Sequence, residues 1–192
     1  FQEVPLEISK LPIGKLSLEG KDFPIGEHVL TFSAANTSSN EIVYVGYGIE
    51  DSNHTNYNDI DVAGKIVLLK SGEPKNTDGT YKISGTSETS IWSNMSESLT
   101  KRIQIAVDKG ATGVLYYSLF IDQILAKEIL SSIDTDDTSK ILAKSLQLSF
   151  ESSNDKITSE NVAAFIKGTE KPNEYLVISS HLDHIGISPN GD

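Results

Sequence analysis

The stretch KRIQIAVDKGATGVLYYS, residues 101–118, carries the clearest secondary-structure pattern of the chain. Apolar residues in and just before it recur at the i, i+4, i+7 and i+8 spacing of an amphipathic helix: Leu99, Ile103, Ala106 and Val107. Gly110 follows where a left-handed residue commonly ends a helix. Residues 111–117 then form an apolar run that is typical of a buried strand. The sequence therefore predicts a helix over 98–109, a tight glycine turn and a strand on which the helix packs.

On the packed face of this helix we expect Ile103 and Ala106 to be buried. Runs of β-branched and aromatic residues bounded by turn residues predict further strands at 29–32, 42–49 and 66–69. The same reasoning predicts a second amphipathic helix, a half-buried strand and a final strand pair at 120–133, 146–150, 162–166 and 175–178. The fold class that follows is α/β and rich in β-structure.

Composition restricts the possible partners and classes of function. The chain has 192 residues, and its 38% hydrophobic content is enough for a core. Sixteen basic residues against 27 acidic ones give a net charge of −11, which disfavours binding to nucleic acid. No apolar run is long enough for a membrane span, and no leader opens the chain. Because Met95 is the only methionine, we expect the chain to be processed or cut from a longer protein.

The chain contains a possible metal-binding motif near its end. The apolar run 175–180 leads into His181-Leu182-Asp183-His184. Open α/β sheets place their sites at the carboxyl ends of strands, and a neutral imidazole is a good zinc ligand. A carboxylate two residues later can hold the other ring nitrogen. His181 is therefore a candidate zinc ligand and Asp183 its orienting partner, although a histidine at a strand end is often an ordinary surface or core residue.

Other candidate motifs are weaker. The loop at 51–61 superficially resembles a calcium loop, but Asn56 and Val62 stand where Gly and Glu are required, so a solvated loop is the better interpretation. The acidic turn 134–137 is interpreted as a solvated helix end. A third alternative, a ligand- or phosphate-binding α/β domain, lacks any glycine-rich phosphate motif.

Three segments resemble the protease-associated (PA) domain that is inserted in zinc aminopeptidases of the M28 family: VYVGYGI (43–49), YNDIDVAGKIVLLKSGEP (57–74) and KRIQIAVDKGATGVLYYS (101–118). The segment ENVAAFIKGTEKPNEYLVISSHLDHIG (160–186) resembles the opening strands of the M28 peptidase domain, and the order of the segments is that of the family.

The resemblance implies a PA-domain-like β-sandwich or open barrel flanked by helices, together with a fragment of the peptidase sheet. It places the PA domain at 12–157. The flanking segments 1–11 and 158–192 would then belong to the peptidase sheet and to the amino-terminal part of the M28 domain.

For the site, the resemblance implies that His181 is the first zinc ligand and that Asp183 orients it. The parent enzyme would use two zinc ions to hydrolyse N-terminal residues from peptides. The remaining ligands and the general base would lie beyond Asp192, and neither Asp192 nor His184 is assigned a ligand role. We therefore expect this chain alone to be catalytically inactive and to bind no zinc tightly.

The bulk of the chain suggests a substrate-access or protein-interaction module. The polar loops at 51–61 and 71–98 would be its surfaces, and a peptide or protein substrate its partner. Tyr57 and Trp92 are possible interaction anchors, although either residue could equally belong to the core. A passive spacer, or a non-enzymatic binding module, is the alternative. The resemblance suggests a secreted or periplasmic parent.

Overall fold

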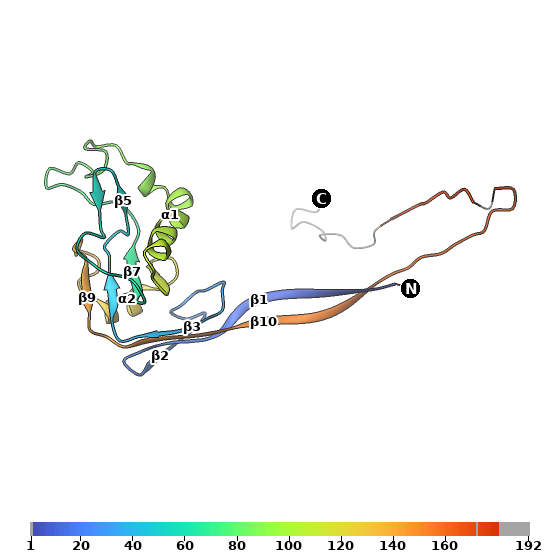
Figure 1. The fold of residues 1–192 in the computed structure, drawn as a ribbon, viewed down its shortest axis with the longest axis horizontal. Helices are drawn as coiled ribbons and strands as arrows, with labels where there is room; N and C mark the ends of the chain where they lie inside the picture. The colour runs from blue at the N-terminus through green and yellow to red at the C-terminus, as the bar shows by residue number, and fades with distance from the viewer. Residues whose placement is uncertain (1, 172, 181–192) are drawn as a thin grey trace, which may run out of the picture. The chain divides into compact units, whose positions relative to one another are not determined.

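The computed structural model describes residues 2–171 and 173–180 (Figure 1). Contacts divide the chain into two compact units, Glu7–Asp155, and Phe1–Leu6 together with Lys156–Asp192. Both helices and all three hydrophobic clusters belong to the first unit. The fold is a β-rich α/β fold, so the fold class expected from the sequence is confirmed.

The central sheet has four strands in the order β8 (Gly113–Tyr117), β7 (Ile66–Lys70), β4 (Ile42–Tyr44) and β9 (Lys140–Leu142). Strand β7 runs parallel to both β4 and β8, while β9 pairs antiparallel with β4. All five residues of β7 are buried. A strand that is covered on both faces has a continuous run of apolar residues in its sequence. For this reason Ile66-Val67-Leu68-Leu69 could be predicted as a strand.

The second sheet has the order β2 (Lys21–Pro24), β1 (Gln2–Leu18), β10 (Leu146–Asn161) and β3 (Ala35–Ser39). Strand β2 pairs antiparallel with the end of β1, and β3 pairs antiparallel with the start of β10. Leu146, Leu148 and Phe150 alternate as buried residues in β10, as the sequence predicts. A separate short hairpin joins β5 (Glu50–Asp51) and β6 (His54–Thr55).

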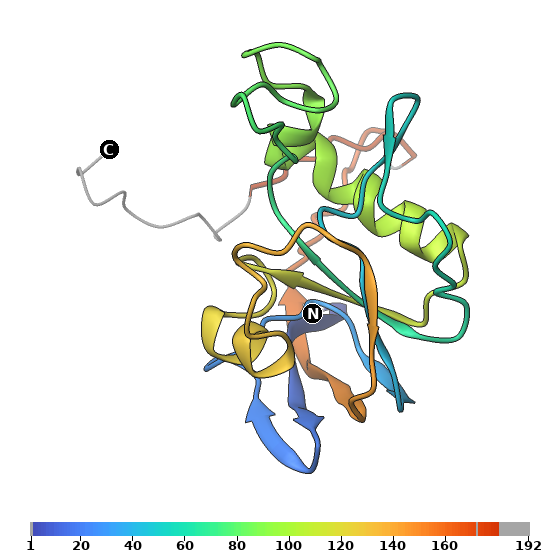
Figure 2. The same cartoon turned by 90° about the vertical axis from the view of Figure 1, so that its left-hand side faces the viewer.

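Two helices cover the central sheet on opposite faces (Figure 2). Helix α1 (Met95–Asp108) follows a 3₁₀ turn, η1 (Ile91–Ser93), and packs with Val43, Val67 and Leu69. Helix α2 (Gln123–Ile129) lies in the cluster that the other face shares with the second sheet. No described helix is long and apolar enough to span a membrane.

The termini of α1 follow simple capping rules. The Asn94 side chain accepts the N–H of Ser96 at the amino end. At the carboxyl end Gly110 has φ +87°, and its N–H donates to the Val107 carbonyl. A side chain is strained at such a φ, so the glycine turn that separates α1 from β8 is a local property of the sequence.

The buried face of α1 differs from the one we expected. Ala106 is buried as predicted, but Ile103 is only half-buried and Val107 is 50% exposed. Ser98 and Arg102 lie on the buried face instead. The helix is rotated toward a polar network, which is described below, and the apolar periodicity contains no sign of that network.

Several predicted strand and helix boundaries were also wrong. Residues 29–32 form no strand, and Val29 makes only isolated bridges. The strand predicted at 42–49 ends at Tyr44, because Gly46 and Gly48 adopt φ values of +55° and +64°. Helix α2 is shorter than the predicted 120–133, since Asp122 caps it and it ends at Ile129.

The predicted strands 162–166 and 175–178 are irregular in the structure. Their large apolar side chains are 68–93% exposed: Val162, Phe165, Ile166, Tyr175, Leu176, Val177 and Ile178. A strand requires a hydrogen-bonded neighbour, and none of the strands in the described part of the chain pairs with these segments. Apolar β-rich composition was therefore not sufficient to form a strand here.

Candidate functional site

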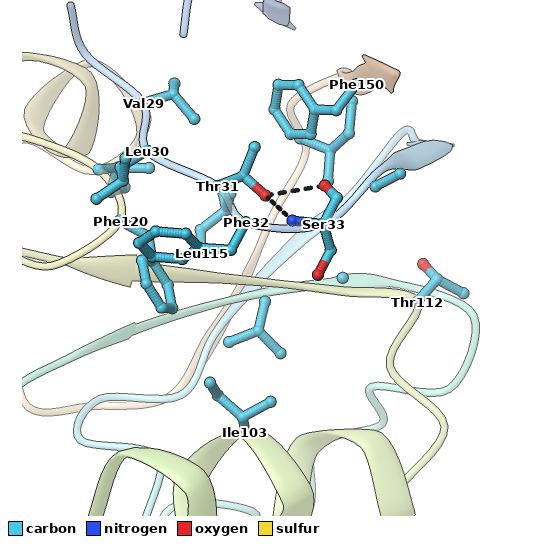
Figure 3. A pocket seen from close by; sticks show the side chains of 15 residues that line it. Val29, Leu30, Thr31, Phe32, Ser33, Ile103, Thr112, Leu115, Phe120 and Phe150 are labelled. Carbon is cyan, nitrogen blue, oxygen red and sulfur yellow. Dashed lines mark hydrogen bonds between the residues drawn. The ribbon is translucent and has the colours of Figure 1, made fainter. Parts of the chain in front are cut away.

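An open, mostly apolar groove of about 280 Å³ lies within the larger unit (Figure 3). One wall is the segment 29–33 and the opposite wall is the start of β8, residues 112–115. Ile103 of α1 lies beneath, and Leu148 and Phe150 of β10 complete the lining. The groove therefore joins segments that are far apart in the sequence.

The β8 wall exposes an edge of the central sheet. Side chains alternate between the two faces of a strand, so a groove that touches four consecutive residues, Thr112 to Leu115, reaches the edge of that strand. Among the described strands, β8 has a neighbour, β7, on one edge only. Gly113 keeps this edge close to β10, because a Cβ there would lie 3.3 Å from Leu148 Cδ1.

The opposite wall is shaped by local contacts. The Thr31 hydroxyl donates to the Ser33 carbonyl at 3.0 Å and accepts the Ser33 N–H at 3.3 Å (Figure 3). The Phe32 ring is 67% exposed and contacts Phe120 edge to face, with 6.4 Å between the ring centroids. A turn and an aromatic pair therefore hold this wall without burying Phe32.

The lining contains no charged side chain. Its members are aliphatic or aromatic residues, glycine, serine and threonine. The hydroxyl of Thr112 donates to the Lys65 carbonyl at 3.2 Å, and that of Thr31 bonds to Ser33. In a chain with a net charge of −11, the groove is an uncharged apolar surface that suits an apolar ligand.

A second cavity of about 350 Å³ is lined by His28, Ser118 and Asp122, among other residues. His28 Nδ1 lies 2.8 Å from Asp122 Oδ2, and Asp122 also accepts the Leu125 N–H at the start of α2. Burial acts to raise the pKa of Asp122, but the bonds from Leu125 and His28 outweigh it and lower that pKa. Ser118 has φ +66°, and its hydroxyl donates to the Tyr117 carbonyl at 2.7 Å. These bonds fasten residues 26–30 to the start of α2.

His181 and Asp183, the metal-site candidates from the sequence, lie outside the residues that the structure describes. Within 2–171 and 173–180, no three His, Cys, Asp or Glu side chains gather closely enough to hold a metal ion.

Tyr57 and Trp92 are buried in this structure, with exposed fractions of 8% and 3%. Trp92 Nε1 donates to Asp51 Oδ2 at 3.0 Å, and this bond lowers the pKa of Asp51. Tyr57 packs in the cluster beneath α1. The sequence left open whether these two residues are interaction anchors or core residues. In the structure both lie in the core, and neither lines the groove.

The loop predicted at 71–98 ends earlier in the structure, because α1 begins at Met95, and it is held by Arg102, a residue that sequence reasoning missed. Arg102 is 1% exposed, and all five of its N–H groups donate to neutral oxygens. The acceptors are the carbonyls of Tyr47, Gly72 and Trp92 and the hydroxyls of Ser98 and Tyr116, at 2.6–2.9 Å. The only local signal was Ser98, four residues earlier and thus on the same helix face.

Lys70 closes the acidic turn 134–137, which was expected to be solvated. Its Nζ donates to the carbonyls of Ile133 and Asp136 and to Asp137 Oδ1, at 2.9–3.1 Å. The Nζ also lies 4.7 Å from the Tyr47 ring centroid. The ammonium group of Lys70 therefore holds the turn at the carboxyl end of β7.

Comparisons with known proteins gave matches only among solved structures. No family model matches the chain, and no curated protein sequence matches it. An aminopeptidase from Aneurinibacillus sp. strain AM-1 aligns with 15% identity and a TM-score of 0.43, over 82% of this chain and 35% of that one. BSAP, a zinc aminopeptidase from Bacillus subtilis, aligns with 12% identity and a TM-score of 0.43, over 81% and 36%. The chain thus spans about a third of each enzyme.

Proposed function

We propose that this chain is an accessory, PA-type module of a zinc aminopeptidase, and that it acts on peptide access or protein binding rather than on catalysis. The observation that carries the proposal is the open, uncharged groove at the β8 edge. Apolar concave sites with a few polar groups are the common form of a binding site. In this proposal, residues 12–157 are the module and a peptide is its partner.

The sequence resemblance supports the same assignment. The three PA-like segments, 43–49, 57–74 and 101–118, supply β4, β7 and the unit formed by α1 and β8. These elements supply three of the four strands of the central sheet and one wall of the groove. The segment 101–118 thus supplies Ile103 and residues 112–115 of the groove, while the rest of the lining comes from other parts of the chain.

The zinc chemistry belongs, in this proposal, to a longer and secreted or periplasmic enzyme that removes N-terminal residues from peptides. Two bound zinc ions would polarise the scissile carbonyl and supply hydroxide. His181 would contribute one imidazole ligand, and Asp183 would hold the other ring nitrogen. One imidazole and one carboxylate are too few for a tight two-metal site.

The access role is tested by deleting residues 12–157 from the longer enzyme and joining the flanking segments. We expect the ratios of kcat/KM among peptides of different length and sequence to change, because the groove no longer contacts the peptide chain. Zinc content and thermal unfolding of the deletion variant report whether the catalytic domain is intact. Unchanged ratios in a folded, zinc-loaded variant would leave only the passive spacer role.

The lack of catalysis is tested on the present chain by zinc titration in a calorimeter and by hydrolysis of aminoacyl chromogenic substrates. We expect no tight zinc site and hydrolysis at background. The His181→Ala variant is the matched control, and its heat of zinc binding should equal that of the parent chain. A submicromolar zinc site with turnover that is lost in His181→Ala would overturn the proposal.

A further inference from the structure

We propose that the groove binds an extended, uncharged apolar peptide segment as an additional strand along the edge of β8. This inference rests on the proposed function and names the class of partner. It is carried by the way Phe120 and Ile121 lie between β8 and the segment 29–33.

Residues 120–121 already take the place of a short strand beside β8. Ile121 forms a parallel bridge with Tyr117 of β8 and an antiparallel bridge with Val29. The Leu30 N–H also donates to the Phe120 carbonyl at 2.8 Å. The backbone at this point is therefore bonded to β8 on one side and to residues 29–30 on the other.

The chain follows this line for only two residues. It leaves β8 in a tight turn in which the N–H groups of Leu119, Phe120 and Ile121 all donate to the Tyr116 carbonyl. The positive φ of Ser118 belongs to this turn. Beyond Phe120, the same line runs between 112–115 on one side and 31–33 on the other, which are the two walls of the groove.

The two bridges of Ile121 place the continuation of this line in the groove. The parallel bridge to Tyr117 leads backward along β8 to Leu115 and Gly113, while the antiparallel bridge to Val29 leads forward to Thr31 and Ser33. Both of these stretches line the groove. A peptide placed there would thus continue the direction of residues 120–121, parallel to β8.

Main-chain groups of β8 face the groove. In a parallel strand, successive residues direct their N–H and C=O groups to opposite edges. The Tyr116 carbonyl accepts the Ile121 N–H at 3.2 Å, so Tyr116 faces the outer edge of β8. The amide group of Val114, two residues earlier, therefore faces the groove, whereas those of Gly113 and Leu115 face β7. Adding a strand to such an edge is a recurrent mode of peptide recognition.

The lining selects the side chains of the peptide. Phe32, Phe120 and Ile103 offer aromatic and aliphatic contacts, and none of the residues that line the groove carries a charge. A charged side chain moved into this groove would lose water without gaining an opposite charge. The preferred peptide therefore has β-branched or aliphatic side chains and no charge.

The test is titration of the ¹⁵N-labelled full chain with the capped peptide acetyl-Thr-Val-Leu-Val-Thr-amide. We expect saturable shifts of the Val114 amide signal. A peptide with two alternate N-methylated residues should bind at least about tenfold more weakly, because it loses main-chain hydrogen bonds. Replacement of both valines by glutamate should weaken binding to a similar degree.

Two variants of this chain localise the binding. Phe32→Asp introduces a charge at the rim and should weaken peptide binding about tenfold or more. Ile124→Asp is the matched control, because Ile124 is similarly exposed, at 59%, and does not line the groove. It should change the affinity by no more than about twofold. Thermal unfolding of both variants checks that each is folded.

Three outcomes would overturn the inference. Equal affinity for the N-methylated peptide would mean that apolar contact alone holds the ligand. Shifts confined to residues outside the groove would place the peptide elsewhere, and occupation of the groove by a second copy would appear as concentration-dependent shifts without peptide. If the deletion of 12–157 still changes peptide preference in any of these cases, the proposed access role stands and only the strand-addition mode fails.

Discussion

Arg102 is buried, yet it fixes the position of the exposed loop that precedes α1. Three of its five hydrogen bonds join α1 to the turn after β4 and to both ends of the loop at 72–92, and the other two go to Ser98 of α1 and Tyr116 of β8. Burial lowers the pKa of its guanidinium, while the Tyr116 hydroxyl and the charge of Glu73 oppose that shift. The loop at 72–92 is therefore anchored to the core through backbone carbonyls, and Trp92 is buried.

We expect Arg102→Met to lower the free energy of unfolding by about 3 kcal/mol or more, because three buried or partly buried carbonyls and two hydroxyls lose their donor. Urea unfolding of the full chain measures this change. The matched control is Lys101→Met, one position earlier on the same helix and exposed. Similar losses in both variants would contradict the structural role assigned to Arg102.

His54 provides a second prediction at the scale of a single residue. Its Nε2 is buried and has no hydrogen-bond partner among the described residues. Burial lowers the pKa of His54 from its ordinary value of 6.5, and the charge of Lys82 lowers it further, while Asn56, Asp137 and Asp51 oppose the shift. The folded state therefore favours the neutral ring.

Because the unfolded chain binds the His54 proton more readily, stability should fall as the pH drops through about 6.5 and below. Urea unfolding at pH 7.5, 6.5 and 5.5 measures this slope. We expect His54→Gln to flatten it. An unchanged slope in His54→Gln would show that other groups are responsible.

At the scale of elements, the faces of α1 decide which apolar residues stabilise the core and which remain available to a ligand. Ala106 packs against the central sheet, whereas Ile103 is half-buried beneath the groove and Val107 faces solvent. The central strand β7 is buried along its whole length. Core stability should thus depend on β7 more than on the apolar stripe of α1.

Alanine substitutions test this division. Ile66→Ala, in β7, should cost about 2–5 kcal/mol of unfolding free energy, since Ile66 is fully buried. Ile103→Ala should cost about 1 kcal/mol and Val107→Ala within about 0.5 kcal/mol. Denaturant unfolding of the three variants provides the measurement. A cost for Ile103→Ala equal to that of Ile66→Ala would place Ile103 in the core.

At the scale of the whole molecule, the two units differ in how they bury apolar surface. The unit Glu7–Asp155 contains every buried residue of the three clusters. The unit that includes Lys156–Asp192 exposes a series of large apolar side chains between residues 162 and 178. Exposed apolar side chains in this number favour association.

A chain restricted to residues 7–155 should therefore unfold cooperatively and within a few degrees of the full chain. It should also remain monomeric at concentrations at which the full chain associates. Thermal unfolding and sedimentation velocity on both chains measure these properties. A truncated chain that does not fold would show that residues outside 7–155 contribute to the core.

Local patterns predicted elements whose environment is uniform and missed those that depend on a distant partner. The run at 66–69 was identifiable because both faces of β7 are covered. Strand β3, with the polar sequence Ala35-Asn36-Thr37-Ser38-Ser39, was not predicted, because pairing with β10 rather than propensity makes it a strand. For the apolar segments near 165 and 176 the opposite error occurred: strands were predicted, but these segments pair with no described strand.

Sequence alone was enough for the β-rich α/β class and for the unit of helix, glycine turn and strand predicted at 98–117, and it makes His181 and Asp183 the metal-site candidates. These depend on residue type and spacing within short segments. Only the tertiary structure decided that Arg102 is buried and that the edge of β8 borders an apolar groove. Both features arise where segments distant in sequence meet, and no local periodicity records which oxygens or side chains those segments bring together.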